Sequence, residues 1–183
     1  MKKIIIITII VSLFLTLFFV FQKGLETKVK YSTKTEKKNG GNISKKMPLF
    51  EFTTLKGKVF SKYNLAENKA TIIVYFDPEC NLCKKSGIVF SKFEKIHKNS
   101  NVLFVTSSSI NKIKKYREDY NLKNVKNISF LQCKEEVFYD TFKELKTPTY
   151  LIYNIDKKLI KIINDDVPIK IILRYIKAAQ VNA

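Results

Sequence analysis

Apolar runs and amphipathic segments alternate along residues 47–183. Ala70 to Phe76 is a continuous apolar run, typical of a strand buried on both faces of a sheet. Helical spacing of apolar residues follows at 80–98, then a strand at 101–106, a helix at 110–120, a strand at 128–132, a helix at 135–145, a strand pair at 149–154 and 159–163, and a helix at 168–177. This β-α-β order predicts an α/β fold whose mixed central sheet has helices on both faces.

Two segments precede this pattern. Residues 49–53 and 58–61 flank Lys56-Gly57, which predicts a small N-terminal β-hairpin. Residues 22–46 are rich in Lys, Thr and Asn and have few apolar side chains, so we expect a flexible basic stem. The folded domain is therefore placed at 47–183.

The first 21 residues predict a signal-anchor. The run from Ile4 to Phe21 is uncharged, and as a helix it would be roughly 27 Å long, close to the hydrocarbon thickness of a bilayer. The small residues of a cleavage site do not follow it, which favours a retained single-pass transmembrane helix. Lysines occur on both sides of the run, so the positive-inside rule gives conflicting orientations. Because long domains translocate largely regardless of charge, we expect the domain on the periplasmic or extracytoplasmic side of the cell membrane.

The chain carries a formal net charge of +18, from 34 basic and 16 acidic residues. The lysines are dispersed through every segment instead of gathering on one helix, so no nucleic-acid partner is predicted. Such a charge favours contact with anionic lipid headgroups or with acidic proteins.

The candidate chemistry lies at Cys80-Asn81-Leu82-Cys83, where a buried strand ends and a helix begins. Residues three apart on a helix are close enough for their sulfurs to join after a modest adjustment. A helix N-terminus favours an anion, so Cys80 is predicted to be the attacking thiolate. Cys83, one turn inside, is predicted to resolve the mixed disulfide.

The charged residues near Cys80 have opposite effects on its thiolate. Lys84 and Lys85 should favour the thiolate, whereas Glu79 should oppose it. Asp77 or Glu79 is a candidate proton acceptor, the alternative being an exposed turn carboxylate without that role.

Neither a metal nor another cofactor is predicted. A zinc site needs four ligands, and only Cys133 and His97 could join the cysteine pair. His97 would lie roughly 21 Å from Cys83 along a continuous helix, too far to share a metal ion.

Three stretches of the chain resemble the thioredoxin superfamily, in particular its membrane-anchored TlpA/ResA-like thiol-disulfide oxidoreductases. They are MPLFEFTTLKGKVFSKYNL, ATIIVYFDPECNLC and KTPTYLIYNIDKKLI, and the resemblance covers about three quarters of the chain. It implies a three-layer thioredoxin-like sandwich in which Pro148 is a cis-proline opposite the cysteines and the backbone near Thr147 pairs with substrate. It further implies disulfide- or dithiol-containing protein partners, with apocytochrome c and other exported proteins as substrate classes, and a membrane electron donor.

Several residues depart from that family's pattern. Glu79 stands where relatives usually have Trp or another uncharged residue, and Val74 stands where many thioredoxins have a buried Asp. Cys133 lies near a position where relatives often have Asp, and it is either a third redox thiol or an isolated, partly buried one.

The preferred interpretation is an enzyme that reduces or isomerises disulfides in extracytoplasmic proteins through a Cys80–Cys83 cycle. A peroxiredoxin would need Pro and Thr where Ile73 and Asp77 stand. A copper-binding module on the same fold, or metallochaperone, normally has three residues between its cysteines and a later histidine. A redox-inactive adaptor is the third alternative.

Overall fold

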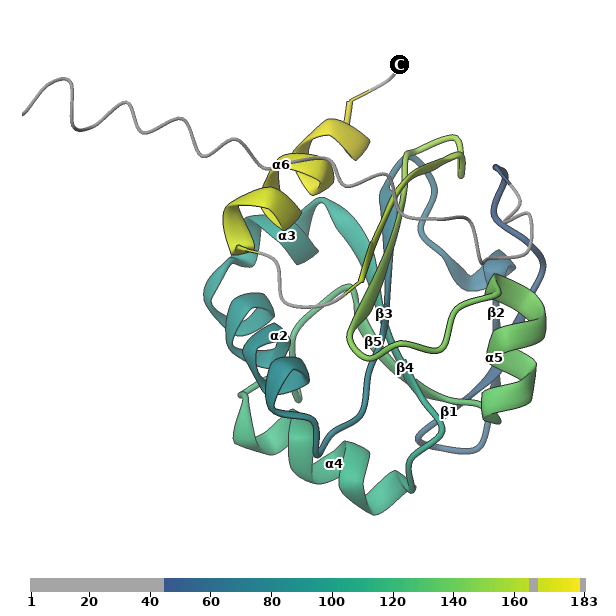
Figure 1. Cartoon of the computed structure of the whole chain (residues 1–183), viewed down its shortest axis with the longest axis vertical. Coiled ribbons are helices and arrows are strands. Elements are labelled where there is room, and N and C mark those ends of the chain that lie inside the picture. Colours follow the sequence, from purple (N-terminus) through teal and green to yellow (C-terminus); the bar gives the residue numbers. More distant parts are fainter. Residues whose placement is uncertain (1–44, 165–167, 182–183) are drawn as a thin grey trace, which may run out of the picture. The chain divides into compact units, whose positions relative to one another are not determined.

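Strands and helices alternate along the residues that the computed structural model describes, 45–164 and 168–181 (Figure 1). The predicted anchor at 1–21 and the predicted stem up to residue 44 lie outside the described residues. Among the helices of the described ranges, none is both long and apolar enough to cross a bilayer.

Seven strands of the described ranges form one mixed sheet in the order β2-β1-β5-β4-β3-β6-β7. β3 and β4, and β4 and β5, pair in parallel, whereas the remaining neighbours are antiparallel. The strands are β1 (Glu51–Thr54), β2 (Val59–Ser61), β3 (Ala70–Tyr75), β4 (Ser100–Thr106), β5 (Ile128–Gln132), β6 (Thr149–Tyr153) and β7 (Leu159–Asn164). The predicted hairpin is confirmed as β1 and β2, and Gly57, with φ of +75°, takes the left-handed conformation that its turn requires.

Alternate side chains of the central strands enter two different cores. On β3, Ile72 and Val74 face one cluster, while Ile73 and Tyr75 face the other. Every residue of β3, β4 and β6 is buried, which explains why their sequences are continuous apolar runs instead of alternating ones.

Helices cover both faces, as predicted. The first cluster receives side chains from α2 (Asn81–Lys92), α3 (Glu94–Lys98), α4 (Ile110–Asp119) and α6 (Ile169–Ala179). The second cluster receives Phe138 and Phe142 of α5 (Glu135–Phe142) together with residues of the N-terminal hairpin. A short 3-10 helix, η1 (Lys62–Asn64), connects β2 to the loop before β3.

Three boundaries differ from the prediction. The helix expected over 80–98 is interrupted at Phe93, whose φ of −104° and ψ of 72° separate α2 from α3. α5 ends at Phe142 because Lys143 adopts a left-handed conformation, three residues before the predicted end. Lys45 and Lys46, assigned to the stem, pair with the start of β7: Leu159 N donates to the Lys45 carbonyl oxygen at 2.7 Å, and Lys46 forms a bridge with Lys158.

Candidate active site

The cysteine pair lies where β3 leads into α2. β3 ends at Tyr75, and Cys80 N donates to the Asp77 carbonyl oxygen at 3.1 Å, closing a tight turn. Cys80 is the N-cap of α2, with extended backbone angles, and its carbonyl oxygen accepts from Lys84 N at 3.1 Å. Within the described part of the chain no side chain caps this helix end, so the first backbone N–H groups of α2 lie next to the partly exposed Cys80. The predicted helix start beside Cys80 is confirmed.

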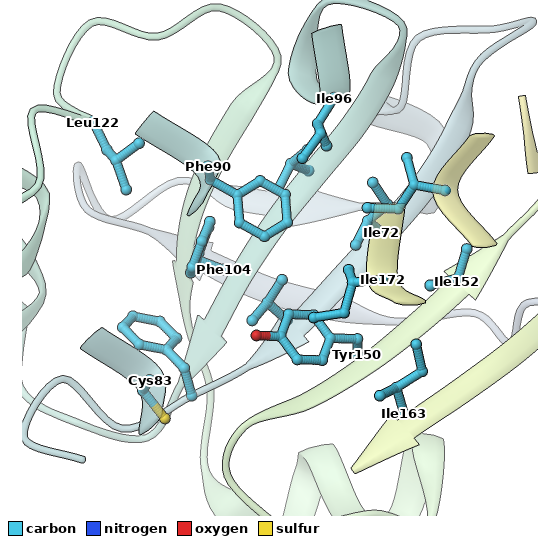
Figure 2. Close-up of a cluster of buried hydrophobic side chains, with 14 of the residues drawn as sticks. Ile72, Cys83, Phe90, Ile96, Phe104, Leu122, Tyr150, Ile152, Ile163 and Ile172 are labelled. Carbon is cyan, nitrogen blue, oxygen red and sulfur yellow. The ribbon is translucent and has the colours of Figure 1, made fainter. Parts of the chain in front are cut away.

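Cys83 faces the protein interior from the first turn of α2. Its side chain is fully buried in the first core cluster (Figure 2). The same cluster contains the apolar side chain of Val74. Burial raises the pKa of Cys83 to about 12, and the Asp77 N–H, which donates to the Cys83 sulfur at 3.4 Å, opposes that effect. The inner sulfur is therefore a protonated thiol at neutral pH.

The loop before β6 completes the site from a distant part of the sequence. Tyr75 at the end of β3 pairs with Thr149 at the start of β6, which brings the preceding loop beside the cysteine turn. The Thr147-Pro148 peptide bond is cis, as predicted. The Cys80 thiol donates to the Thr147 carbonyl oxygen at 3.9 Å, so the outer sulfur lies against this loop.

Of the two predicted carboxylates, Glu79 is exposed and Asp77 is half-buried. Asp77 Oδ1 accepts from Glu79 N at 2.9 Å, so this carboxylate stabilises the turn. Lys112 Nζ of α4 forms an ion pair with Glu79 Oε2 at 2.6 Å, and that carboxylate raises the pKa of Lys112. The negative charge next to the outer cysteine is thus partly neutralised, by a residue that the sequence analysis did not single out.

Buried polar groups behind α2 were also missed. Tyr116 Oη of α4 donates to the Cys83 carbonyl oxygen at 2.6 Å, and Ser86 Oγ and Tyr150 Oη lie 2.5 Å apart in the core. Figure 2 shows Tyr150 and Cys83 within one group of side chains. The sequence gives one signal for these contacts: Ser86, Tyr116 and Tyr150 carry polar atoms at positions that the helix or strand pattern predicts to be buried.

The third cysteine and the histidine lie in other surroundings. Cys133 follows β5 and packs against the second core cluster, whereas both residues of the cysteine pair pack in the first. Burial raises the pKa of Cys133 to about 12. His97 is buried in the last turn of α3, and that burial lowers its pKa. Among the described residues, no three His, Cys, Asp or Glu side chains come together as a metal site.

The strand order, the cis-proline loop and the cysteine pair at a helix N-terminus define a protein of thioredoxin-like fold. Neither a protein-family model nor a curated protein matches the chain.

Solved structures do match it. A secreted Mycobacterium tuberculosis disulfide oxidoreductase, homologous to E. coli DsbE, aligns at 17% identity and a TM-score of 0.60, over 70% of this chain and 95% of its own. A thioredoxin from Neisseria meningitidis aligns at 21% identity and a TM-score of 0.62, over 74% of this chain and 91% of its own. BsSco, of the Sco family of cytochrome c oxidase assembly proteins, aligns at 18% identity and a TM-score of 0.59, over 78% of this chain and 96% of its own. At such identities the similarity establishes the thioredoxin-like α/β fold.

Proposed function

We propose that this protein is a thiol-disulfide oxidoreductase that reduces or isomerises disulfides through a Cys80–Cys83 dithiol/disulfide cycle. The observation that carries the proposal is the arrangement of the two sulfurs. Cys80 is partly exposed at the N-terminus of α2 and contacts the Thr147 carbonyl oxygen, while Cys83 is buried one turn behind it. A secreted disulfide oxidoreductase and a thiol:disulfide interchange protein are among the solved structures that share the fold.

The proposed cycle transfers two electrons. The Cys80 thiolate attacks a substrate disulfide, forms a mixed disulfide and releases one substrate thiolate. Cys83 then attacks the Cys80 sulfur, which forms the Cys80–Cys83 disulfide, reduces the substrate completely and releases its second sulfur. The proton of Cys83 passes to a base or to the departing thiolate. A membrane donor returns two electrons to the Cys80–Cys83 disulfide.

The proposed location is the extracytoplasmic side of the cell membrane, with the N-terminal segment as a single-pass anchor. The uncharged run Ile4–Phe21 supports this location. Two of the proteins with similar structures are described as a secreted oxidoreductase and a pneumococcal exposed lipoprotein thioredoxin. Exported proteins with disulfides, apocytochrome c among them, are the proposed substrate class.

Insulin reduction by the full chain with dithiothreitol tests the proposal. We expect Cys80→Ser to abolish turnover and Cys83→Ser to accumulate mixed disulfides on Cys80, because the resolving thiol is missing. Cys133→Ser is the matched control, since its sulfur packs in the other core cluster, and it should retain turnover. Equal activity of the wild type and Cys80→Ser would overturn the proposal. The reduction potential measured against glutathione decides the direction of electron flow.

A copper-binding module is the second candidate, because the Cys80 and Cys83 thiols on one helix turn are soft ligands of the kind that Cu(I) prefers. Copper(I) titration of the reduced chain tests that role. Tight binding that is lost in both Cys80→Ser and Cys83→Ser, together with absent insulin reduction, would favour the copper-binding module over the oxidoreductase. Loss of both activities would favour the redox-inactive adaptor.

A further inference from the structure

One end of the sheet is built almost entirely from lysine-rich segments. Because β3, β4 and β5 are parallel, the segments that lead into them lie at the end remote from the cysteine pair. Hydrogen bonds join these segments to one another. Lys157 Nζ donates to the Lys69 carbonyl oxygen at 2.7 Å, and Lys69 Nζ donates to the Lys98 carbonyl oxygen at 3.1 Å. The Asn127 amide donates to the His97 carbonyl oxygen at 2.9 Å.

The entry to the domain and the end of α6 lie at the same place. Met47 N donates to the Lys157 carbonyl oxygen at 2.8 Å, and Gln180 Nε2 donates to Ser100 Oγ at 2.9 Å. In Figure 1 the turn between β6 and β7 and the C-terminal end of α6 lie at the top, whereas the loop from β3 into α2 lies at the bottom. We call segments 45–47, 62–69, 94–99, 121–127, 154–158 and 177–181 the basic pole.

Charge is distributed unequally between the two ends. The basic pole has eleven lysines against three acidic residues: Lys45, Lys46, Lys62, Lys69, Lys95, Lys98, Lys123, Lys126, Lys157, Lys158 and Lys177 against Glu67, Glu94 and Asp156. Eight of those lysines are exposed. The segments 76–85, 107–112, 133–136 and 143–148 at the cysteine end have six lysines and five acidic residues, so their charges nearly balance. The net positive charge of the domain is thus concentrated away from the cysteines.

Two further observations fit a charged, interfacial surface. The pKa of Lys157 is lowered, first by burial and then by the nearby positive charge of Lys62. Tyr63 is 83% exposed and Val181 is 64% exposed, so two apolar side chains project from segments of the pole. Tyrosine is enriched where a protein surface meets lipid headgroups.

We propose that the basic pole docks onto an anionic lipid surface and so holds the cysteine end away from the membrane. The chain enters the domain at this pole, and the 44 residues that precede Lys45 include the uncharged run Ile4–Phe21. Residues 22–44 could span at most about 80 Å, so a tether of that length alone does not fix the domain at the surface. This inference rests on the proposed membrane attachment, and the path of the chain favours lipid over an acidic protein or RNA.

Lysine footprinting of the full chain tests the docking. The chain is reconstituted into nanodiscs of phosphatidylcholine alone or mixed with phosphatidylglycerol, and treated with an amine-acetylating reagent. We expect acetylation of Lys98, Lys126 and Lys158 to slow only in the anionic nanodiscs, and high salt to reverse the protection. Lys146, near the cysteines, should react equally in both.

Matched charge variants provide the control. Lys98→Gln/Lys126→Gln/Lys158→Gln removes three exposed charges from the pole, and we expect the ratio of docked to undocked domain to fall roughly a hundredfold, from about fivefold per lysine. Lys56→Gln/Lys114→Gln/Lys134→Gln removes three exposed charges elsewhere, and should leave the protection of the remaining pole lysines unchanged.

The docking, the oxidoreductase activity and the membrane anchor are each tested by a different measurement. Equal acetylation of the pole lysines in both nanodiscs would overturn the docking, as would stronger protection by added RNA or polyglutamate than by anionic lipid. Insulin reduction measures the oxidoreductase proposal independently, and the pole variant should keep that activity. Release of the chain from vesicles by alkaline carbonate would refute the anchor. Co-sedimentation with anionic but not neutral vesicles would then still test the pole, and its absence would overturn the docking.

Discussion

The close approach of α2 to α4 makes Gly87→Ala an informative substitution. A Cβ atom at Gly87 would lie 2.6 Å from Tyr120 Cγ, 2.7 Å from Tyr120 Cδ2 and 2.9 Å from Tyr116 Oη. An ordinary van der Waals contact begins near 3.4 Å, so the facing atoms must separate by about 0.8 Å. Tyr116 is buried and donates to the Cys83 carbonyl oxygen, so the shift reaches the turn that carries the inner thiol.

Two opposing effects set the change in the free energy of unfolding. Alanine in a helix interior is favoured over glycine by about 0.5–1 kcal/mol, whereas overpacking a tight contact costs about 1–3 kcal/mol. We therefore expect Gly87→Ala to destabilise the reduced protein by about 1–2 kcal/mol. Urea denaturation of the full chain in mild detergent, followed by circular dichroism at a helix wavelength, measures the change in the free energy of unfolding.

A double-mutant cycle isolates the contact. In a Tyr120→Ala background two of the three close atoms are absent and only the contact with Tyr116 Oη at 2.9 Å is left, so Gly87→Ala should cost much less there. A coupling of about 1 kcal/mol or more between the two positions is expected. The reasoning fails if Gly87→Ala stabilises the wild-type protein, or if its effect is the same in both backgrounds.

Three further predictions address burial and charge. The reduced protein should lose stability as pH rises from 9 toward about 12, because folding raises the pKa of Cys83. The protonated Cys83 thiol contributes its full stabilisation below the pKa of the unfolded chain, about 9, and that contribution is lost as pH rises to the pKa of the folded protein, about 12. Denaturation on both sides of pH 9 should show a smaller loss in Cys83→Ser. Phe104→Ala, which removes a fully buried ring, should cost about 3–5 kcal/mol in the same assay. Lys112→Met should leave stability almost unchanged, because the ion pair is exposed, but it should slow iodoacetamide alkylation of Cys80, because the neighbouring carboxylate is left uncompensated. Lys115→Met, which breaks another exposed ion pair on α4, should leave that rate unchanged.

Local patterns were sufficient to predict the order of the elements. Ala70–Tyr75 forms a strand buried on both faces, and its apolar run contains that information without reference to any other segment. The helix start at Cys80 follows from the end of that strand and from Pro78, which cannot continue it.

Boundaries set by tertiary contacts could not be predicted in the same way. The interruption at Phe93 lies inside a segment whose apolar spacing continues to Ile96, so periodicity alone does not reveal it. The pairing of Lys45 with the start of β7 joins residues that are more than a hundred positions apart. The same applies to the ion pair between Glu79 and Lys112, since nothing local marks which lysine faces the turn.

The two sulfurs lie one helix turn apart and have different surroundings. Cys80 lies against the loop before β6, whereas Cys83 points into the core, where Val74 offers no carboxylate to accept its proton. Under the proposed mechanism, burial keeps Cys83 protonated while Cys80 awaits a substrate. Attack by Cys83 on a mixed disulfide generates a thiolate beside it, and that departing sulfur is itself a base. A buried acid group is therefore not required for resolution, and the Asp77 N–H, already directed at the Cys83 sulfur, stabilises the negative charge that develops there.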